Sequence, residues 1–151
     1  MEVSLVDSSV DALKLASANV RDLGVEVHAA AADAMELLGE MDGESFDVVI
    51  CDPPAFVKKK ADSESGLRAY TKLNRDAIRL VKPGGVFVAS SCSGLVKTDD
   101  WTRVLVDASA KAGRTFKQVL CGGHGPDHPV RPEFPEGQYL KCLIGRIEYP
   151  Y

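Results

Sequence analysis

The sequence lacks the features that mark membrane-spanning, secreted and polyanion-coating proteins. Its 151 residues contain no apolar run long enough to cross a bilayer, and no secretory signal stands before the first expected strand. The formal net charge is −4, which argues against non-specific polyanion binding and leaves room only for a local basic patch. No repeat, low-complexity tract or interdomain linker interrupts the chain. We therefore expect one cytoplasmic domain with a hydrophobic core and no membrane partner.

The cysteines lack the arrangement of a metal site. None of the four lies in a CxxC pair, and no histidine stands near them at ligand spacing, so we expect no metal. In a chain without a secretory signal they are expected to be reduced thiols. Cys51, Cys121 and Cys142 are expected to be small buried hydrophobic residues, whereas Cys92 has a second interpretation that is given below.

What the sequence does contain is a regular alternation of strand and helix patterns. Apolar runs predict strands over residues 3–6, 25–29, 46–51, 86–90, 115–120 and 139–147. Between them, helical spacing predicts a helix capped by Ser8 or Ser9 and stopped by Gly24, one over 33–41, one over about 66–82, and one capped by Thr98 and closed by Gly113. This order predicts an α/β fold, a doubly wound sheet with helices on both faces that ends in an antiparallel strand pair.

The run Phe46–Cys51 is the strongest strand signal, since Asp47 is its only charged residue. Such runs are typical of central parallel strands that are covered on both faces. Polar residues stand where this strand and its neighbours end: Asp7, Asp33, Asp52 and the run Ser91-Cys92-Ser93-Gly94. Ligands of open α/β sheets collect at those carboxyl ends, so the set predicts a binding site. A single acid after a strand often only caps the next helix, which remains an alternative for Asp7 and Asp33.

The spacing of these strand ends is similar to the nucleoside end of a class I methyltransferase cofactor site. Asp7, with Ser8 beside it, is positioned to accept hydrogen bonds from ribose hydroxyls. Asp33 is placed to accept from an adenine amino group, with the amide of Ala34 facing the ring. Asp52-Pro53-Pro54 is expected to form a rigid turn facing the transferred methyl group, because two prolines fix φ and withhold amide donors.

From residue 52 onward the chain resembles bacterial 23S ribosomal RNA cytosine-5 methyltransferases that carry an N-terminal PUA domain. The segments that carry the resemblance are 52–58 (DPPAFVK), 66–74 (GLRAYTKLN), 82–85 (KPGG), 91–95 (SCSGL), 127–130 (DHPV) and 135–141 (PEGQYLK). The resemblance implies a Rossmann-like class I methyltransferase fold, S-adenosyl-L-methionine as cofactor and ribosomal RNA as substrate. It covers the chain from Asp52 nearly to the C-terminus.

The resemblance also gives roles to two residues. It implies that Cys92 is the nucleophile, whose thiolate adds to carbon 6 of cytosine and so makes carbon 5 reactive toward a methyl group. It implies that Asp52 binds the cytosine edge or assists protonation at ring nitrogen 3. The alternative for Cys92 is a buried strand cysteine. Many relatives carry a second cysteine after the prolines, but Ala55 stands there, so Cys51 is expected to be a core residue and the proton-removing base stays unassigned.

Residues just after the prolines are candidates for substrate contact. Pro54 and Phe56 are expected to face the target base, with Phe56 either stacking on it or packing in the core. Lys58, Lys59 and Lys60 are expected either to meet RNA phosphates or to form a solvated loop. The pair His128-Pro129 is expected to shape a turn.

One expected element of such a cofactor site is missing, because no glycine-rich turn precedes Asp7. Residues 1–151 are therefore interpreted as a single, N-terminally truncated methyltransferase domain without its first strand and helix. Two strand edges are then left open, through which a homodimer is a possibility. Two alternatives stay open: a non-catalytic remnant of the fold, or a methyltransferase that acts on amino nitrogen through the Asp-Pro-Pro-aromatic motif.

Overall fold

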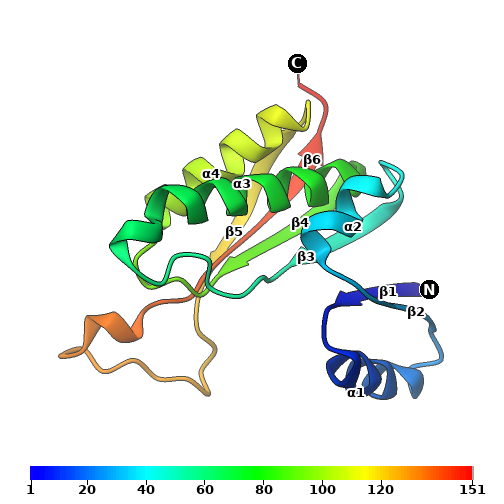
Figure 1. The fold of residues 1–151 in the computed structure, drawn as a ribbon, viewed down its shortest axis with the longest axis horizontal. Helices are drawn as coiled ribbons and strands as arrows, with labels where there is room; N and C mark the ends of the chain where they lie inside the picture. Colours follow the sequence, from blue (N-terminus) through cyan, green and yellow to red (C-terminus); the bar gives the residue numbers. More distant parts are fainter. Residues whose placement is uncertain (151) are drawn as a thin grey trace. The chain divides into compact units, whose positions relative to one another are not determined.

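The computed structural model describes residues 1–150 and falls into two compact units, Met1–Met41 and Asp42–Tyr151. Figure 1 shows the helices and strands of both, and each unit is described by itself. None of the described helices is long and apolar enough to cross a membrane. Over the same residues, no three metal-ligating side chains gather in one place.

The first unit is a strand–helix–strand motif followed by a short helix. Its elements are β1 (Glu2–Asp7), α1 (Val10–Arg21), β2 (Glu26–Ala31) and α2 (Ala34–Glu40). The two strands are parallel, and Asp7 pairs with Ala31 at their carboxyl ends. Ser9 caps α1 by accepting a hydrogen bond from the amide of Ala12 at 3.2 Å, and Gly24 follows the helix with φ +65°. The predicted cap and stop of this helix are thus confirmed.

The second unit contains a four-stranded sheet. Its elements are β3 (Phe46–Cys51), the 3-10 turn η1 (Lys60–Asp62), α3 (Ser63–Leu80), β4 (Val81–Ser91), α4 (Thr98–Lys111), β5 (Thr115–Gly122), the 3-10 turn η2 (Pro135–Gly137) and β6 (Lys141–Glu148). The strand order is β3-β4-β6-β5. Strand β3 is parallel to β4, and β6 is antiparallel to both β4 and β5. The α/β class and the antiparallel C-terminal pair are as the sequence predicts.

The core of the second unit lies between this sheet and the helices α3 and α4, which run side by side (Figure 1). Strands β4 and β6 contribute Phe87, Ala89, Leu143 and Ile147, all at most 1% exposed. The fully buried Trp101 of α4 donates from its indole nitrogen to the carbonyl of Ala89 at 3.3 Å. Burying an aromatic side chain of this kind stabilises a fold by about 1.5–3 kcal/mol, and the hydrogen bond satisfies its polar atom.

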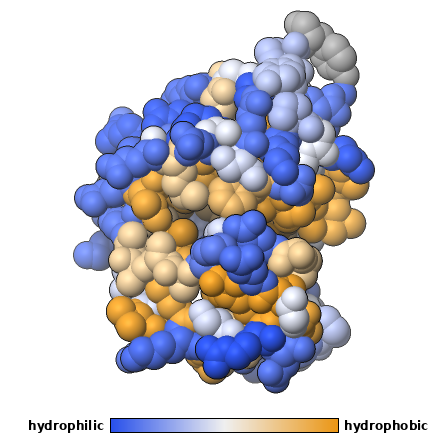
Figure 2. Space-filling model, turned by 90° about the vertical axis from the view of Figure 1, so that its right-hand side faces the viewer, coloured by the Kyte–Doolittle hydropathy of each residue, from blue (hydrophilic) through white to orange (hydrophobic). Residues whose placement is uncertain are grey.

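Strand β3 is not the covered central strand that its composition predicts. It pairs with β4 on one side only, so it is an edge strand of this sheet, and Val48 and Ile50 are 54% and 70% exposed. The opposite edge strand, β5, also carries exposed apolar residues, Val119 and Leu120. Figure 2 shows exposed apolar residues beside hydrophilic ones on the face that it presents. The open side of β3 departs from the covered position that the composition alone predicts, and it agrees with the open strand edges expected beside a missing first strand.

Two helix boundaries also differ from the prediction. Helix α3 ends at Leu80 and β4 begins at Val81, so residues 82–85 belong to the strand and do not simply end the helix. The pairing with β3 shifts register between Phe46 and Val48, and Gly84 adopts φ +81°, so this stretch is a bulge that the glycine permits. Thr98 is the first residue of α4 and not its cap, since Lys97 holds the cap position without a side-chain hydrogen bond.

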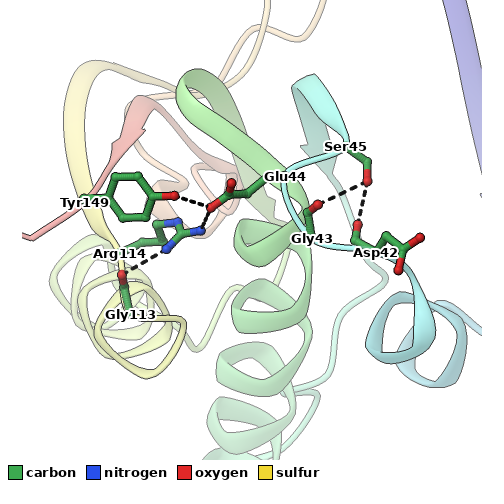
Figure 3. Close-up of polar contacts among 7 residues, drawn as sticks. All are labelled: Asp42, Gly43, Glu44, Ser45, Gly113, Arg114 and Tyr149. Atoms are coloured by element: carbon green, nitrogen blue, oxygen red, sulfur yellow. Dashed lines mark hydrogen bonds and ion pairs between the residues drawn. The ribbon is translucent and has the colours of Figure 1, made fainter.

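A polar cluster fixes the end of this sheet where β3 begins (Figure 3). Glu44 forms an ion pair with Arg114 and accepts a hydrogen bond from the Tyr149 hydroxyl at 2.6 Å. The Arg114 guanidinium lies 4.4 Å from the centre of the Tyr149 ring. The hydrogen bond to the Glu44 carboxylate raises the pKa of Tyr149, because it favours the protonated phenol. The cluster joins residues before β3, before β5 and after β6, leaving the other end of the sheet to the predicted site.

Candidate functional site

The strand-end acids of the first unit lie at one end of its parallel strands. Asp7 ends β1, and its Oδ1 accepts a hydrogen bond from the amide of Ser9 at 2.7 Å. Asp33 caps α2, and its Oδ1 accepts from the amide of Met35 at 2.7 Å. Asp7 also accepts from the amide of Ala32 through its carbonyl, at 3.1 Å. The local capping role that was left open for these acids is therefore present in both.

These contacts do not use up the two carboxylates. Both side chains are exposed, and in each the second carboxylate oxygen has no partner among residues 1–150. A carboxylate oxygen accepts hydrogen bonds from hydroxyl and amino groups alike. Ser8 is exposed beside Asp7, and Ala34 begins α2 beside Asp33. The structure thus brings together the four residues predicted for the nucleoside end, each with local contacts only.

In the second unit, the two remaining motifs meet at the carboxyl end of the parallel pair β3 and β4. Cys51 pairs with Ala89, so Asp52 and the prolines leave the sheet beside the run Ser91–Ser93 that carries Cys92. Asp52 is exposed and Pro53 is half-buried. The sequence placed these segments at one edge of a sheet, and the structure confirms that placement.

A buried tyrosine joins the two segments. The side chain of Tyr70, on α3, is 0% exposed. Its hydroxyl lies 3.3 Å from the carbonyl of Pro54 and 3.2 Å from the amide of Phe56, and so holds the loop that follows Asp52. It also lies 2.8 Å from the hydroxyl of Ser93 and 3.2 Å from that of Ser91, on either side of the candidate nucleophile. One side chain thus fixes the distance between the two motifs.

Packing holds the same loop from the other side. The ring of Phe56 lies 4.6 Å from that of Tyr70, and the amide of Val57 donates to the Ser93 hydroxyl at 3.3 Å. Gly66, in the first turns of α3, allows the close approach: a Cβ there would lie 2.8 Å from the Phe56 carbonyl oxygen and 2.5 Å from Val57. Phe56 is half-buried, so packing on Tyr70 is the contact that the structure gives it.

The four thiols differ in exposure. Cys51 is buried, and this burial, with a smaller contribution from the charge of Asp52, raises the pKa of its thiol to about 12, as expected for a core cysteine. Cys92 is half-buried between two buried serines. Cys121 is exposed on the edge strand β5 and Cys142 is half-buried, so the prediction that both are core residues is wrong for Cys121. An edge strand offers no second partner to cover it.

A lysine that sequence reasoning did not single out lies next to Cys92. Lys141 begins β6, is 7% exposed, and donates from Nζ to the carbonyl of Ser93 at 2.6 Å and to that of Tyr139 at 2.8 Å. It lines a groove of about 500 Å³ with His124 and other residues of the loop that precedes β6. The signal in the sequence was a lysine at a strand start with apolar residues around it, where a charge is unusual.

Other residues of that loop and of the lysine run are mostly exposed. The rings of His124 and His128 stack with their centres 5.0 Å apart, and the amide of His128 donates to the carbonyl of Gly125 at 3.0 Å, as expected for a turn. Lys58, Lys59 and Lys60 are exposed, and none forms an ion pair with another described residue. The structure thus leaves these three charges available to solvent or a ligand.

Comparison with known proteins places the chain in a family. A family model described as a methyltransferase domain matches residues 1–132. Ribosomal RNA large subunit methyltransferase I of Klebsiella pneumoniae is 38% identical over 97% of this chain and 38% of its own length. The protein of the same name from Cronobacter sakazakii is 39% identical over 93% of this chain and 37% of its own length. The chain therefore spans less than two fifths of the curated relatives it matches.

Solved structures agree in fold at lower identity. A protein from Streptococcus mutans, described as a SAM-dependent methyltransferase, has a TM-score of 0.75 at 17% identity over 97% of this chain and 38% of its own. A methyltransferase solved in complex with SAH gives 0.74 at 18% identity over 96% of this chain and 39% of its own. The fold is thus that of class I methyltransferases, as predicted, and the predicted likeness to ribosomal RNA methyltransferases is confirmed in sequence. The chain belongs to the methyltransferase domain family.

Proposed function

We propose that this chain is the catalytic-domain part of an S-adenosylmethionine-dependent methyltransferase that modifies carbon 5 of a cytosine in ribosomal RNA. The observation that carries the proposal is the junction at Tyr70, which fixes the loop after Asp52 against the segment that bears Cys92. A covalent mechanism needs a nucleophile and a base-binding loop at a fixed separation. The names of the relatives support ribosomal RNA as the substrate class.

The residues at the strand ends fit the cofactor. Asp7 and Asp33 each keep an exposed carboxylate oxygen without a partner among the described residues, which suits the ribose hydroxyls and the adenine amino group. Ser8 and Ala34 would contribute the neighbouring contacts. In the second unit, Asp52 and Pro53 would face the methyl end. When bound, S-adenosylmethionine supplies an activated methyl group.

Cys92 provides the covalent chemistry in this mechanism. Its thiolate adds to carbon 6 of the cytosine, forming a carbon–sulfur bond and moving electron density to carbon 5, which accepts the methyl group. Asp52 binds the edge of the base and assists protonation at ring nitrogen 3, which eases that addition. Loss of the carbon-5 proton then returns the electrons to the ring, and the carbon–sulfur bond breaks to release the thiolate.

The exposed residues beside the site would hold the RNA. Lys58, Lys59 and Lys60 follow the loop and form no ion pair with a described residue, so they suit phosphate oxygens. Pro54 would border the base, and Phe56, whose ring packs on Tyr70 at an interplanar angle of 42° and is half-buried, would offer its exposed part to a base taken out of its helix.

Methylation assays with Cys92→Ala test the chemistry. The substrate is a ribosomal RNA transcript with labelled S-adenosylmethionine, and the product nucleoside is identified by mass spectrometry. We expect 5-methylcytidine from a longer protein in which a glycine-rich turn and first strand precede this chain, and a loss of at least about a thousandfold in rate for its Cys92→Ala variant, as nucleophile removal typically gives. Cys121→Ala, at an exposed thiol outside the site, is the matched control and should keep full activity.

Other outcomes of these measurements would support a different function for the chain. Methylation of an amino nitrogen that persists in Cys92→Ala would replace the cysteine mechanism by the amino-nitrogen alternative. Titration calorimetry with S-adenosylmethionine separates the remaining case: no heat at millimolar cofactor, from a folded chain, would identify a non-catalytic member of the fold. Binding that falls at least about tenfold in Asp7→Ala would support the assigned nucleoside end, since a carboxylate bound to ribose contributes about 1.5–3 kcal/mol.

A further inference from the structure

The second unit contains a buried lysine whose charge has no carboxylate partner. Lys141 is 7% exposed, and no aspartate or glutamate among residues 1–150 forms an ion pair with it. Its ammonium group has three donors, of which two are used by the carbonyls of Ser93 and Tyr139 at 2.6 and 2.8 Å. Burying an ammonium without an opposite charge is costly, so a chain that keeps one here has a use for its positive charge.

The position of this charge is set by the sheet. Lys141 pairs with Ser91 across the antiparallel strands β4 and β6, and its side chain extends past the end of β4 to the carbonyl of Ser93. The ammonium thereby reaches the carbonyl of Ser93, the residue that follows Cys92. Burial lowers the pKa of Lys141, and the interaction with Cys92 counteracts this by favouring the charged amine.

The other titratable groups near this segment are few. Lys97, which precedes α4, adds a second positive charge that lowers the pKa of Lys141 slightly further. Tyr70 contributes its phenol from α3 through Ser91 and Ser93. Asp52 follows β3 at the same edge of the sheet, and the His124 ring lines the groove beside Lys141. Lys141 is the buried cation of this set, because Lys97 is exposed.

We propose that Lys141 is a positioning residue for the nucleophile: its ammonium group stabilises the thiolate of Cys92, and its hydrogen bond to the carbonyl of Ser93 fixes the backbone next to Cys92. This inference rests on the role proposed above for Cys92. The third N–H of Lys141 has no partner among the described residues and is available to the negative charge on sulfur. The ammonium group of Lys141 stabilises the thiolate at two steps. The first is the loss of the thiol proton before attack on carbon 6, and the second is the cleavage of the carbon–sulfur bond that releases the thiolate.

Alkylation of the thiol measures this effect without RNA or cofactor. Iodoacetamide reacts with the thiolate form, and mass spectrometry of peptides reports the rate at each cysteine separately. Lys141→Gln keeps a donor for the two carbonyls and removes the charge. We expect Cys92 in this variant to be alkylated about tenfold more slowly at pH 7.5, because the attacking sulfur no longer has a positive charge beside it. Lys141→Arg, which keeps the charge, should restore at least half of the lost rate.

Two controls make the result decisive. Lys111→Gln removes an exposed lysine of α4 and should leave the rate at Cys92 unchanged. Cys51 is buried, so its protection from iodoacetamide shows in every variant that the sheet is folded. Should Lys141→Gln unfold, Lys141→Met is compared with Lys141→Arg in its place.

The outcome separates this inference from the proposed function. An unchanged alkylation rate at Cys92 in folded Lys141→Gln would overturn the role of Lys141 and leave the role of Cys92 intact. A slow Lys141→Gln variant in a chain whose Cys92→Ala form still methylates RNA would support the interaction and reject the nucleophile. A slow variant rescued by arginine, together with a dead Cys92→Ala, would support both.

Discussion

The predicted site residues of the first unit and those of the second are held in different ways. Asp7 and Asp33 are exposed, and their side chains contact only backbone amides two residues along the chain. Cys92 and the loop after Asp52 are held by Tyr70 and Lys141, through hydrogen bonds that join residues 14 to 48 positions apart in sequence. Binding groups can sit on local turns, whereas groups that make and break bonds need support from the core.

The first unit also has a much smaller hydrophobic core than the second. Of residues 1–41, Leu13 is the buried hydrophobic residue, whereas α3, α4, β4 and β6 together supply most of the core of the second unit. A unit with so little buried apolar surface opens easily, because few contacts oppose its conformational entropy. The comparison therefore predicts that residues 1–41 unfold more easily than residues 42–150.

The largest expected effect is a core truncation in the second unit. Phe87 is fully buried in β4, and Phe87→Ala should lower the free energy of unfolding by about 3–5 kcal/mol through lost burial and a cavity. Urea denaturation followed by tryptophan fluorescence measures this, since Trp101 lies in the same core. The exposed Val119→Ala is the control and should stay within about 0.5 kcal/mol. A cost below about 1 kcal/mol for Phe87→Ala would mean that this core is loosely packed.

A smaller effect on stability is expected from removal of the Tyr70 hydroxyl, which joins the loop after Asp52 to the segment Ser91–Ser93. Tyr70→Phe removes the hydrogen bonds to Ser91 and Ser93 and leaves their buried hydroxyls with fewer partners. We expect a loss of about 1–3 kcal/mol in stability. Amide exchange at Phe56 and Val57 should accelerate more than in the rest of the sheet, which hydrogen-exchange mass spectrometry detects. Equal acceleration everywhere would show that Tyr70 supports the core in general and not this junction.

A cap substitution separates the two roles of Asp33 in the first unit. Serine is as good a helix cap as aspartate, but it is too short to reach a bound adenine. Asp33→Ser should therefore change the stability of α2 by less than about 0.5 kcal/mol while weakening S-adenosylmethionine binding several-fold. Circular dichroism and titration calorimetry measure the two quantities. Unchanged affinity would return Asp33 to the capping role alone.

The smallest effect is expected at the polar cluster at the far end of the sheet. The pKa of Tyr149 is raised by its hydrogen bond to Glu44, so the folded state favours the protonated phenol. This contribution is complete below the unfolded pKa of tyrosine, about 10, and is lost as the pH rises through the higher folded value. Melting temperatures measured from pH 8 to 11 should therefore fall less steeply in Tyr149→Phe. Parallel curves for the two proteins would contradict the assigned hydrogen bond.

The sequence was sufficient for features that depend on neighbouring residues. The cap at Ser9, the stop at Gly24 and the limits of β3 at Phe46 and Cys51 are as predicted, because local patterns determine them. The meeting of Asp52–Pro54 with Ser91–Ser93 also followed, since parallel strands bring their carboxyl ends to one edge.

What the sequence could not supply are the contacts between distant residues. Tyr70 was placed correctly on the apolar face of α3, yet nothing local shows that its hydroxyl meets Pro54 and Ser93. Lys141 ends the segment 135–141 that carries the family resemblance, but nothing in that segment predicts its burial, because burial depends on which strands lie beside β6. Strand β3 has the composition of a central strand and lies at an edge for the same reason. Which strands pair with one another depends on the fold of the whole chain and not on the local sequence of each strand.

The most direct measurement of the central claim is covalent trapping on RNA that contains 5-fluorocytosine. Fluorine at carbon 5 cannot leave as a proton does, so after methyl transfer the elimination step stalls and the enzyme stays bonded to carbon 6. The account predicts a protein–RNA adduct that requires S-adenosylmethionine and maps by mass spectrometry to the peptide with Cys92. Methylation of normal RNA without any adduct on the fluorinated RNA, or an adduct at another cysteine, would contradict it.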